Sequence, residues 1–208
     1  MHYAGYTHRD IKLENILLSR TKDGDLDPIL TDFGSAGPLT VPLTTRQDAM
    51  EVVDVASRHT TISYRPPELW PGELSTTSLS SPMTHVTSST GAVFDYAKVD
   101  VWMVGCVLFG ILFAISPYEC HFQRSTGQVQ VVETTQNKIL SDQIPWPGQD
   151  TPTHQWYATN QWQQLRNTIQ WILHPNRFER PTLSEVQHRV HELLEQNSFR
   201  RTAGSTTT

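Results

Sequence analysis

Four polar side chains near the start of the 208-residue chain have types and spacing suited to metal-assisted transfer of a phosphoryl group. Asp10 lies in the string His-Arg-Asp-Ile-Lys-Leu-Glu-Asn, and Asp32 opens the string Asp-Phe-Gly. A carboxylate such as that of Asp10 can orient an attacking hydroxyl and accept its proton. Lys12 can steady the charge of the moving group. Oxygen atoms of Asn15 and Asp32 suit magnesium, which is a hard cation.

The backbone between these side chains must bring them together. Residues 16–18 and 28–31 have the apolar character of short strands, and the segment between them carries Gly24 and several aspartates, as turns do. The pattern therefore predicts a β-hairpin. Because a hairpin brings its two ends together, we expect Asn15 and Asp32 to face one metal site.

The turn of this hairpin has a rival interpretation. Asp23, Asp25 and Asp27 alternate as the first ligands of a calcium-binding loop do. That motif needs a glycine where Pro28 stands and a glutamate where Gly34 stands. Since both positions fail, a solvated turn is the better interpretation.

The two strings, in this order and with Asp32 seventeen residues after Asn15, resemble the C-terminal lobe of a eukaryotic protein kinase. The resemblance implies an α+β fold that is mainly α, with short β-hairpins at the active site. It implies that Asp10 and Lys12 are catalytic and that Lys12, Asn15 and Asp32 bind ATP. Asn15 and Asp32 would hold Mg²⁺, and the partners would be protein substrates with a serine or threonine acceptor.

A segment between Asp32 and Glu68 matches the activation segment of the family. It ends in Tyr-Arg-Pro-Pro-Glu, where the family has Ala-Pro-Glu and Pro66 replaces the usual alanine. Thr61 matches the threonine that bonds the catalytic aspartate and lysine in serine/threonine kinases. Together with Lys12, it favours serine or threonine over tyrosine as the acceptor.

Four charged residues have structural roles by the same resemblance. Arg180 is expected to form a buried ion pair with Glu68. Asp100 precedes an apolar run and is expected to cap a helix there and to hold the backbone of the His-Arg-Asp turn. For Arg9 two roles stay open: bonding loop carbonyls, or binding a phosphorylated residue of the activation segment. The candidates for that phosphorylated residue are Thr40, Thr44, Thr45 and Thr60.

Strings at residues 34–36, 60–65 and 101–109 resemble the Numb-associated kinase family more closely. Residues 116–123 favour, within that family, the branch that carries myristoyl and palmitoyl groups. We expect residues 1–196 to form a kinase domain that consists of the C-terminal lobe alone, because no glycine-rich phosphate loop, strand lysine or partner glutamate is found. An insert rich in serine and threonine covers residues 71–93, and residues 197–208 are expected to be a disordered tail.

These expectations leave two functions open. The first is a serine/threonine protein kinase that transfers the γ-phosphoryl group of ATP to proteins. The second is a non-catalytic binding module, because a lobe without the roof of the nucleotide site positions ATP poorly.

Composition narrows the partners and the location. A net charge of −5 with few charge runs argues against nucleic acid as a partner. Cys106 and Cys120 lack metal-ligand spacing and indicate a reducing compartment. The apolar run of residues 101–115 is short for a membrane span, so we expect a cytoplasmic protein. Membrane association would depend on an N-terminus that this sequence does not contain.

Apolar spacing predicts helices over residues 47–59, 101–115, 128–140, 160–173 and 182–195. In the last of these, one stripe holds Leu183, Val186, Val190, Leu193 and Leu194. His188 and His191 on the same helix are three residues apart and could bind a metal. Without a third ligand in reach, two surface histidines are the better interpretation.

Overall fold

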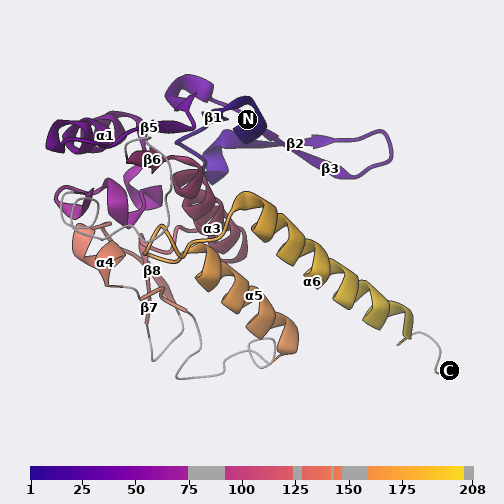
Figure 1. The fold of residues 1–208 in the computed structure, drawn as a ribbon. Helices are drawn as coiled ribbons and strands as arrows, with labels where there is room; N and C mark the ends of the chain where they lie inside the picture. Colours follow the sequence, from indigo (N-terminus) through magenta and orange to yellow (C-terminus); the bar gives the residue numbers. More distant parts are fainter. Residues whose placement is uncertain (75–91, 124–127, 142, 147–158, 204–208) are drawn as a thin grey trace.

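The computed structural model of this chain describes residues 1–74, 92–123, 128–141, 143–146 and 159–203. Helix α3 (Ala97–Phe113) runs through the middle of the molecule, and the other helices surround it (Figure 1). These are α1 (Arg46–His59), α4 (Gln136–Leu140), α5 (Asn160–Ile172) and α6 (Leu183–Ala203). Short 3-10 helices cover His2–Ala4, Leu13–Asn15, Phe33–Ser35, Ile62–Tyr64 and Pro67–Leu69. Helices combined with short strand pairs agree with the expected α+β class.

All described strands form antiparallel pairs. Strands β2 (Ile16–Arg20) and β3 (Leu26–Leu30) make the predicted hairpin, in which Ile16 lies opposite Leu30. This hairpin projects from the body of the molecule (Figure 1). The other pairs are β1 (Tyr6–Thr7) with β4 (Gly37–Pro38), β5 (Thr40–Pro42) with β6 (Val93–Asp95), and β7 (Cys120–Phe122) with β8 (Val129–Val131).

The central helix α3 begins earlier than its apolar run indicates. Asp100 lies within the first turn and is not the cap, because the helix begins at Ala97 and Tyr96 precedes it. The carboxylate of Asp95 accepts a hydrogen bond of 2.8 Å from the backbone N–H of Ala97. The prediction that Asp100 caps this helix was therefore wrong. Side chains of α3 that are almost fully buried form the middle of the core: Val99, Trp102, Met103, Cys106 and Phe109.

Helices α1 and α5 confirm the predictions for residues 47–59 and 160–173 within one residue at each end. The prediction of one helix over residues 128–140 was wrong in its first half. Val129 and Val131 belong to β8, where they lie opposite Phe122 and Cys120 of β7, and only Gln136–Leu140 is helical. Valine favours a pleated strand when a partner strand is present, and the partner decides the outcome here.

Helix α6 is longer than predicted. It continues to Ala203, so the part of the expected disordered tail up to that residue is helical. The predicted apolar stripe is buried only in part: Val186 is 4% exposed, whereas Leu183 is 42% and Leu194 is 65% exposed. Most of the insert expected over residues 71–93 falls on residues 75–91, which lie outside the described part of the chain.

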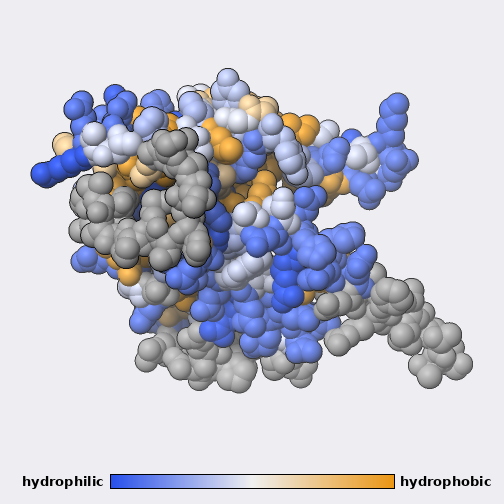
Figure 2. Space-filling model, in the orientation of Figure 1, coloured by the Kyte–Doolittle hydropathy of each residue, from blue (hydrophilic) through white to orange (hydrophobic). Residues whose placement is uncertain are grey.

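Hydrophilic side chains cover α5 and α6, as Figure 2 shows, whereas apolar side chains gather above α3, between α1 and the hairpin of β2 and β3. Among the described residues, no helix is long and apolar enough to cross a membrane.

Candidate active site

Asp10, Lys12 and Thr61 form a closed set of polar contacts. The Lys12 ammonium lies 3.0 Å from Asp10 Oδ2 and donates a hydrogen bond of 2.8 Å to Thr61 Oγ1. The hydroxyl and the backbone N–H of Thr61 both donate to Asp10 Oδ1, at 2.7 Å and 2.9 Å. Each group is therefore held by the other two. The contacts join residues 8–15, named the catalytic loop below after the resemblance to kinases, to Thr61 near the end of the segment between Asp32 and Glu68.

Asn15 supports the same carboxylate from the other side. Its amide nitrogen donates to the backbone oxygen of Asp10 at 2.8 Å and, at 3.3 Å, to Asp10 Oδ2. Both residues are buried. Because the nitrogen of the amide faces Asp10, the amide oxygen of Asn15 is the atom suited to a cation.

These contacts determine the charge state of Asp10. Burial raises the pKa of the Asp10 carboxyl, but the hydrogen bonds from Thr61 and Lys12 and the charge of Lys12 together outweigh it. The net result is a pKa below the ordinary value for an aspartate. The carboxylate is therefore charged at neutral pH and can accept hydrogen bonds.

Asp32 comes directly after Thr31, the residue that is bonded to Asn15 at the open end of the β2–β3 hairpin. The N–H and the hydroxyl of Thr31 donate to the backbone oxygen of Asn15 at 2.9 Å and 3.1 Å, and the next residue is Asp32. Asp32 has a left-handed backbone with φ of 60°, and its exposed carboxylate accepts from the N–H of Gly34 at 3.3 Å. The hairpin thus places Asn15 opposite Thr31, the residue directly before Asp32.

The oxygen atoms of Asn15 and Asp32 are chemically suited to magnesium. Among the described residues, no group of three or more histidine, cysteine, aspartate or glutamate side chains is placed to hold a metal ion, and this includes His188 and His191. Magnesium commonly takes one or two carboxylates and completes its shell with phosphate oxygens and water. The residues present therefore fit a magnesium ion that arrives with a nucleotide.

His8 joins the catalytic loop to the Asp-Phe-Gly segment, a role that sequence reasoning missed. Its Nε2 lies 3.0 Å from the backbone oxygen of Thr31, and its Nδ1 accepts a hydrogen bond of 3.3 Å from the N–H of Asp10. Its ring meets Phe33 edge-on, with 5.2 Å between ring centres. His8 is fully buried. The signal for its role in the sequence was its position directly before Arg9 in the His-Arg-Asp motif.

Two roles were expected for Arg9, and the structure shows the first of them, a hydrogen bond to a loop carbonyl. The side chain is 8% exposed and donates from Nη2 to the backbone oxygen of Pro38 at 2.7 Å. Its Nε donates to the hydroxyl of Thr7 at 3.3 Å, and its guanidinium carbon lies 3.7 Å from the centre of the Tyr96 ring. No phosphorylated residue is needed to hold it in this position.

Asp100 holds the backbone of the His-Arg-Asp turn. Its Oδ2 accepts from the N–H of His8 at 2.9 Å, and its Oδ1 accepts from the N–H of Arg9 at 2.8 Å. Sequence reasoning missed the third partner, His2, whose Nε2 lies 2.8 Å from Asp100 Oδ2. Asp100 is 3% exposed, so these three contacts satisfy a buried carboxylate.

Glu68 and Arg180 form a buried, two-pronged ion pair. Nη1 and Nη2 of Arg180 donate to the two carboxylate oxygens of Glu68 at 2.7 Å and 2.9 Å. Arg180 also donates to the backbone oxygens of His174 and Lys98, at 3.1 Å and 2.6 Å, and lies over the ring of Trp102. This pair fixes the end of the activation segment to the body of the molecule.

The chain belongs to the family of the protein kinase domain, whose model matches residues 1–191. It is 33% identical to serine/threonine-protein kinase 16 of Mus musculus over 145 residues, which are 70% of this chain and 40% of that protein. The Homo sapiens protein of the same name has the same identity and coverage. Serine/threonine-protein kinase ENV7 of Saccharomyces cerevisiae is 32% identical over 114 residues, which are 55% of this chain and 26% of that protein. The alignments thus span about two fifths of the first two relatives.

Proposed function

We propose that this chain supplies the catalytic residues of a serine/threonine protein kinase that transfers the γ-phosphoryl group of ATP to a protein hydroxyl. The observation that carries the proposal is the closed set of contacts among Asp10, Lys12 and Thr61. Phosphoryl transfer depends mainly on positioning and electrostatic stabilisation, and these contacts fix both a carboxylate and an ammonium before a substrate binds.

In this proposal each residue has one task. Asp10 orients the acceptor hydroxyl and takes its proton, for which its low pKa keeps the carboxylate ready. Lys12 stabilises the charge on the transferred group. Asn15 and Asp32 would hold Mg²⁺, which neutralises the phosphate oxygens of bound ATP. Thr61 keeps Asp10 and Lys12 in register with the activation segment.

Two finer assignments belong to the same proposal. The resemblance at residues 34–36, 60–65 and 101–109 supports membership of the Numb-associated kinase family, in the branch that carries lipid groups. The two free, buried cysteines support a cytoplasmic location, because a reducing compartment keeps thiols unpaired. Fractionation of cells that express the tagged protein would test the location: recovery in a secretory compartment contradicts it.

The test of function is transfer of radiolabelled phosphate from ATP and Mg²⁺ to a generic protein substrate. We expect Asp10→Asn to reduce the rate by a factor on the order of 10²–10⁴, because the proton acceptor is lost. Asp25→Asn removes an exposed carboxylate of the hairpin turn and is the matched control, with no change expected. Equal rates for Asp10→Asn and the unchanged chain contradict the proposal. Absence of transfer both by the unchanged chain and by the chain lengthened with any coding sequence upstream of Met1 contradicts the proposal and favours a non-catalytic binding module.

A further inference from the structure

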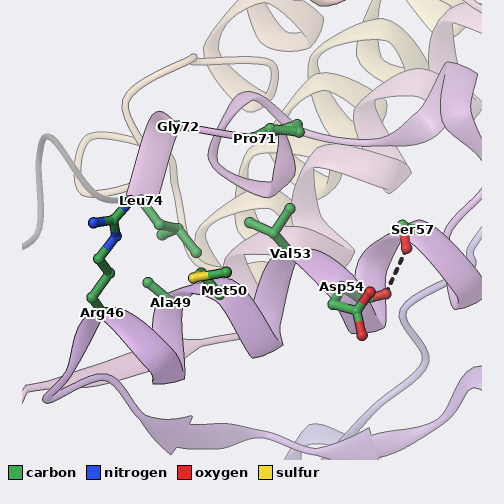
Figure 3. A pocket seen from close by; sticks show the side chains of 9 residues that line it. All are labelled: Arg46, Ala49, Met50, Val53, Asp54, Ser57, Pro71, Gly72 and Leu74. Carbon is green, nitrogen blue, oxygen red and sulfur yellow. Dashed lines mark hydrogen bonds between the residues drawn. The ribbon is translucent and has the colours of Figure 1, made fainter.

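A groove of about 370 Å³ lies between α1 and the residues that follow Trp70. Figure 3 shows Ala49, Met50 and Val53 of α1 on one wall and Leu74 on the other. Met50 is 63% exposed, whereas methionine is among the residues most often buried in folded proteins. Met50 therefore presents apolar surface to solvent, whereas Ala49 and Leu74 are buried, at 7% and 2% exposed.

The two ends of the groove differ in charge. Arg46 lies at one end and Asp54 at the other (Figure 3). Asp54 forms an ion pair of 3.0 Å with Arg58. Asp48, the acidic residue nearest Arg46 in α1, accepts three hydrogen bonds from residues 44–45. Arg46 forms no ion pair with any described residue, so its end of the groove offers a cation to an incoming carboxylate.

The groove is joined to the candidate active site through α1. Helix α1 ends at His59, the hydroxyl of Thr60 donates to the backbone oxygen of Arg9 at 3.4 Å, and Thr61 contacts Asp10. Thr60 is seven positions after Val53, which is about 10 Å along the helix axis. An extended peptide covers that distance with about three residues.

We propose that this groove binds protein substrates through one apolar side chain and one nearby carboxylate. The proposal rests on the function proposed above. The apolar side chain, such as leucine, contacts Met50 and Val53 and lies about three to five residues from the acceptor hydroxyl. The carboxylate lies about two residues further on and faces Arg46. Met50 suits this wall of the groove because the flexible, polarisable side chain of methionine adapts to different apolar groups.

The probes are fluorescein-labelled peptides that carry one serine, a leucine four residues away and a glutamate two residues beyond the leucine. Two peptides, with the pair before or after the serine, cover both directions of a substrate chain. We expect one of them to bind the full chain in a fluorescence anisotropy titration. Replacing its leucine by alanine weakens binding about tenfold or more, because a buried leucine side chain is lost.

Two variants of the protein test the two halves of the groove. Met50→Asp places a charge on the apolar wall and should weaken binding about tenfold or more. Ile111→Asp is its control, because Ile111 of α3 is 66% exposed and lies outside the groove. Arg46→Glu should weaken binding about two- to fivefold, and a peptide with lysine in place of glutamate should restore it. Glu51→Lys, which changes an exposed charge of α1 outside the groove, should leave binding unchanged.

Anisotropy is independent of phosphoryl transfer, so the two proposals fail separately. Binding that depends on Met50 supports the groove even if no phosphate is transferred. Transfer that is unaffected by Met50→Asp, or peptides that do not bind the unchanged chain, overturns the groove and leaves the kinase proposal standing. If Met50→Asp changes the sedimentation of the chain but not peptide binding, a second copy occupies the groove and the proposal is wrong.

Discussion

The guanidinium carbon of Arg9 lies 3.7 Å from the centre of the Tyr96 ring, and this contact joins the catalytic loop to the start of α3. Burial lowers the pKa of Arg9, and the neighbouring Tyr96 and Asp100 oppose that effect. The arginine forms no ion pair with a described residue, so an aromatic face and the Pro38 carbonyl compensate for its lost water. Arg9 therefore stabilises the folded structure of the site through its contacts with Tyr96 and Pro38.

Gly37→Ala should destabilise the protein through Arg9. A Cβ atom at Gly37 would overlap the guanidinium carbon and both terminal nitrogens of Arg9, so the side chain must leave its contact with Pro38. We expect a loss of about 1–3 kcal/mol in the free energy of unfolding, measured by urea denaturation. In an Arg9→Ala background the same change should cost little, because the overlap is gone. Equal costs in both backgrounds would show that Arg9 is not the cause.

Local signals were sufficient to predict the hairpin and two of the helices. Strands β2 and β3 pair with each other across a short turn, so their sequence contains both partners. Helices α1 and α5 begin after threonines, Thr45 and Thr159, which accept hydrogen bonds from the N–H groups of Asp48 and Trp162.

Elements that depend on distant partners could not be predicted in the same way. Strand β8 exists because β7 lies beside it, and without that partner its valines fit a helical pattern equally well. The start of α3 is set by the carboxylate of Asp95 at the end of β6. In the site, motifs located Asp10 and Asp100, but the contact of Asp100 with His2 joins residues 98 positions apart. No local pattern reports such a contact.

Thr61→Val should raise the pKa of Asp10. The change removes the hydroxyl that donates to Asp10 Oδ1, so burial of the carboxyl is less opposed. In the unchanged protein the depressed pKa stabilises the fold above the ordinary pKa of about 3.9, and this contribution is lost as pH falls through the lower folded value. In the variant it should be lost at higher pH.

The measurement is an NMR titration of the Asp10 carboxyl carbon between about pH 2 and pH 6, a range that brackets the ordinary aspartate value. Thr40→Val is the control, because Thr40 is exposed and makes no hydrogen bond to Asp10. An unchanged Asp10 titration in Thr61→Val would show that the hydroxyl does not set this pKa.

Cys106 and Cys120 should be unreactive in the folded protein. Burial raises the pKa of the Cys120 thiol to about 12 and raises that of Cys106 further. Because the thiolate is the reactive form, a disulfide reagent such as dithionitrobenzoate at pH 8 should modify neither cysteine in minutes. In denaturing urea both thiols should react at once, and this reaction shows how much signal two thiols give. Rapid reaction of either thiol without urea would mean that this part of the core opens readily.

Breaking the buried pair of Glu68 and Arg180 should cost much more than breaking a surface pair. Glu68→Gln leaves the guanidinium without its charge partner in a site that is 1% exposed, and we expect a loss of about 3–5 kcal/mol in the free energy of unfolding. Arg189→Met breaks an exposed pair with Glu192, whose atoms are 3.6 Å apart, and should cost about 0–1 kcal/mol. Urea denaturation of both variants gives the comparison.

The double variant Glu68→Leu with Arg180→Met tests the origin of that cost. If an unpaired buried charge is the cause, the double variant should lose less stability than the sum of the two single variants. It should still be less stable than the unchanged protein, because Arg180 also donates to the backbone oxygens of His174 and Lys98, which methionine leaves without a donor. If the losses in the free energy of unfolding of the two single variants simply add, the two side chains stabilise the fold independently. The packing of Arg180 over Trp102 would then matter more than its ion pair with Glu68.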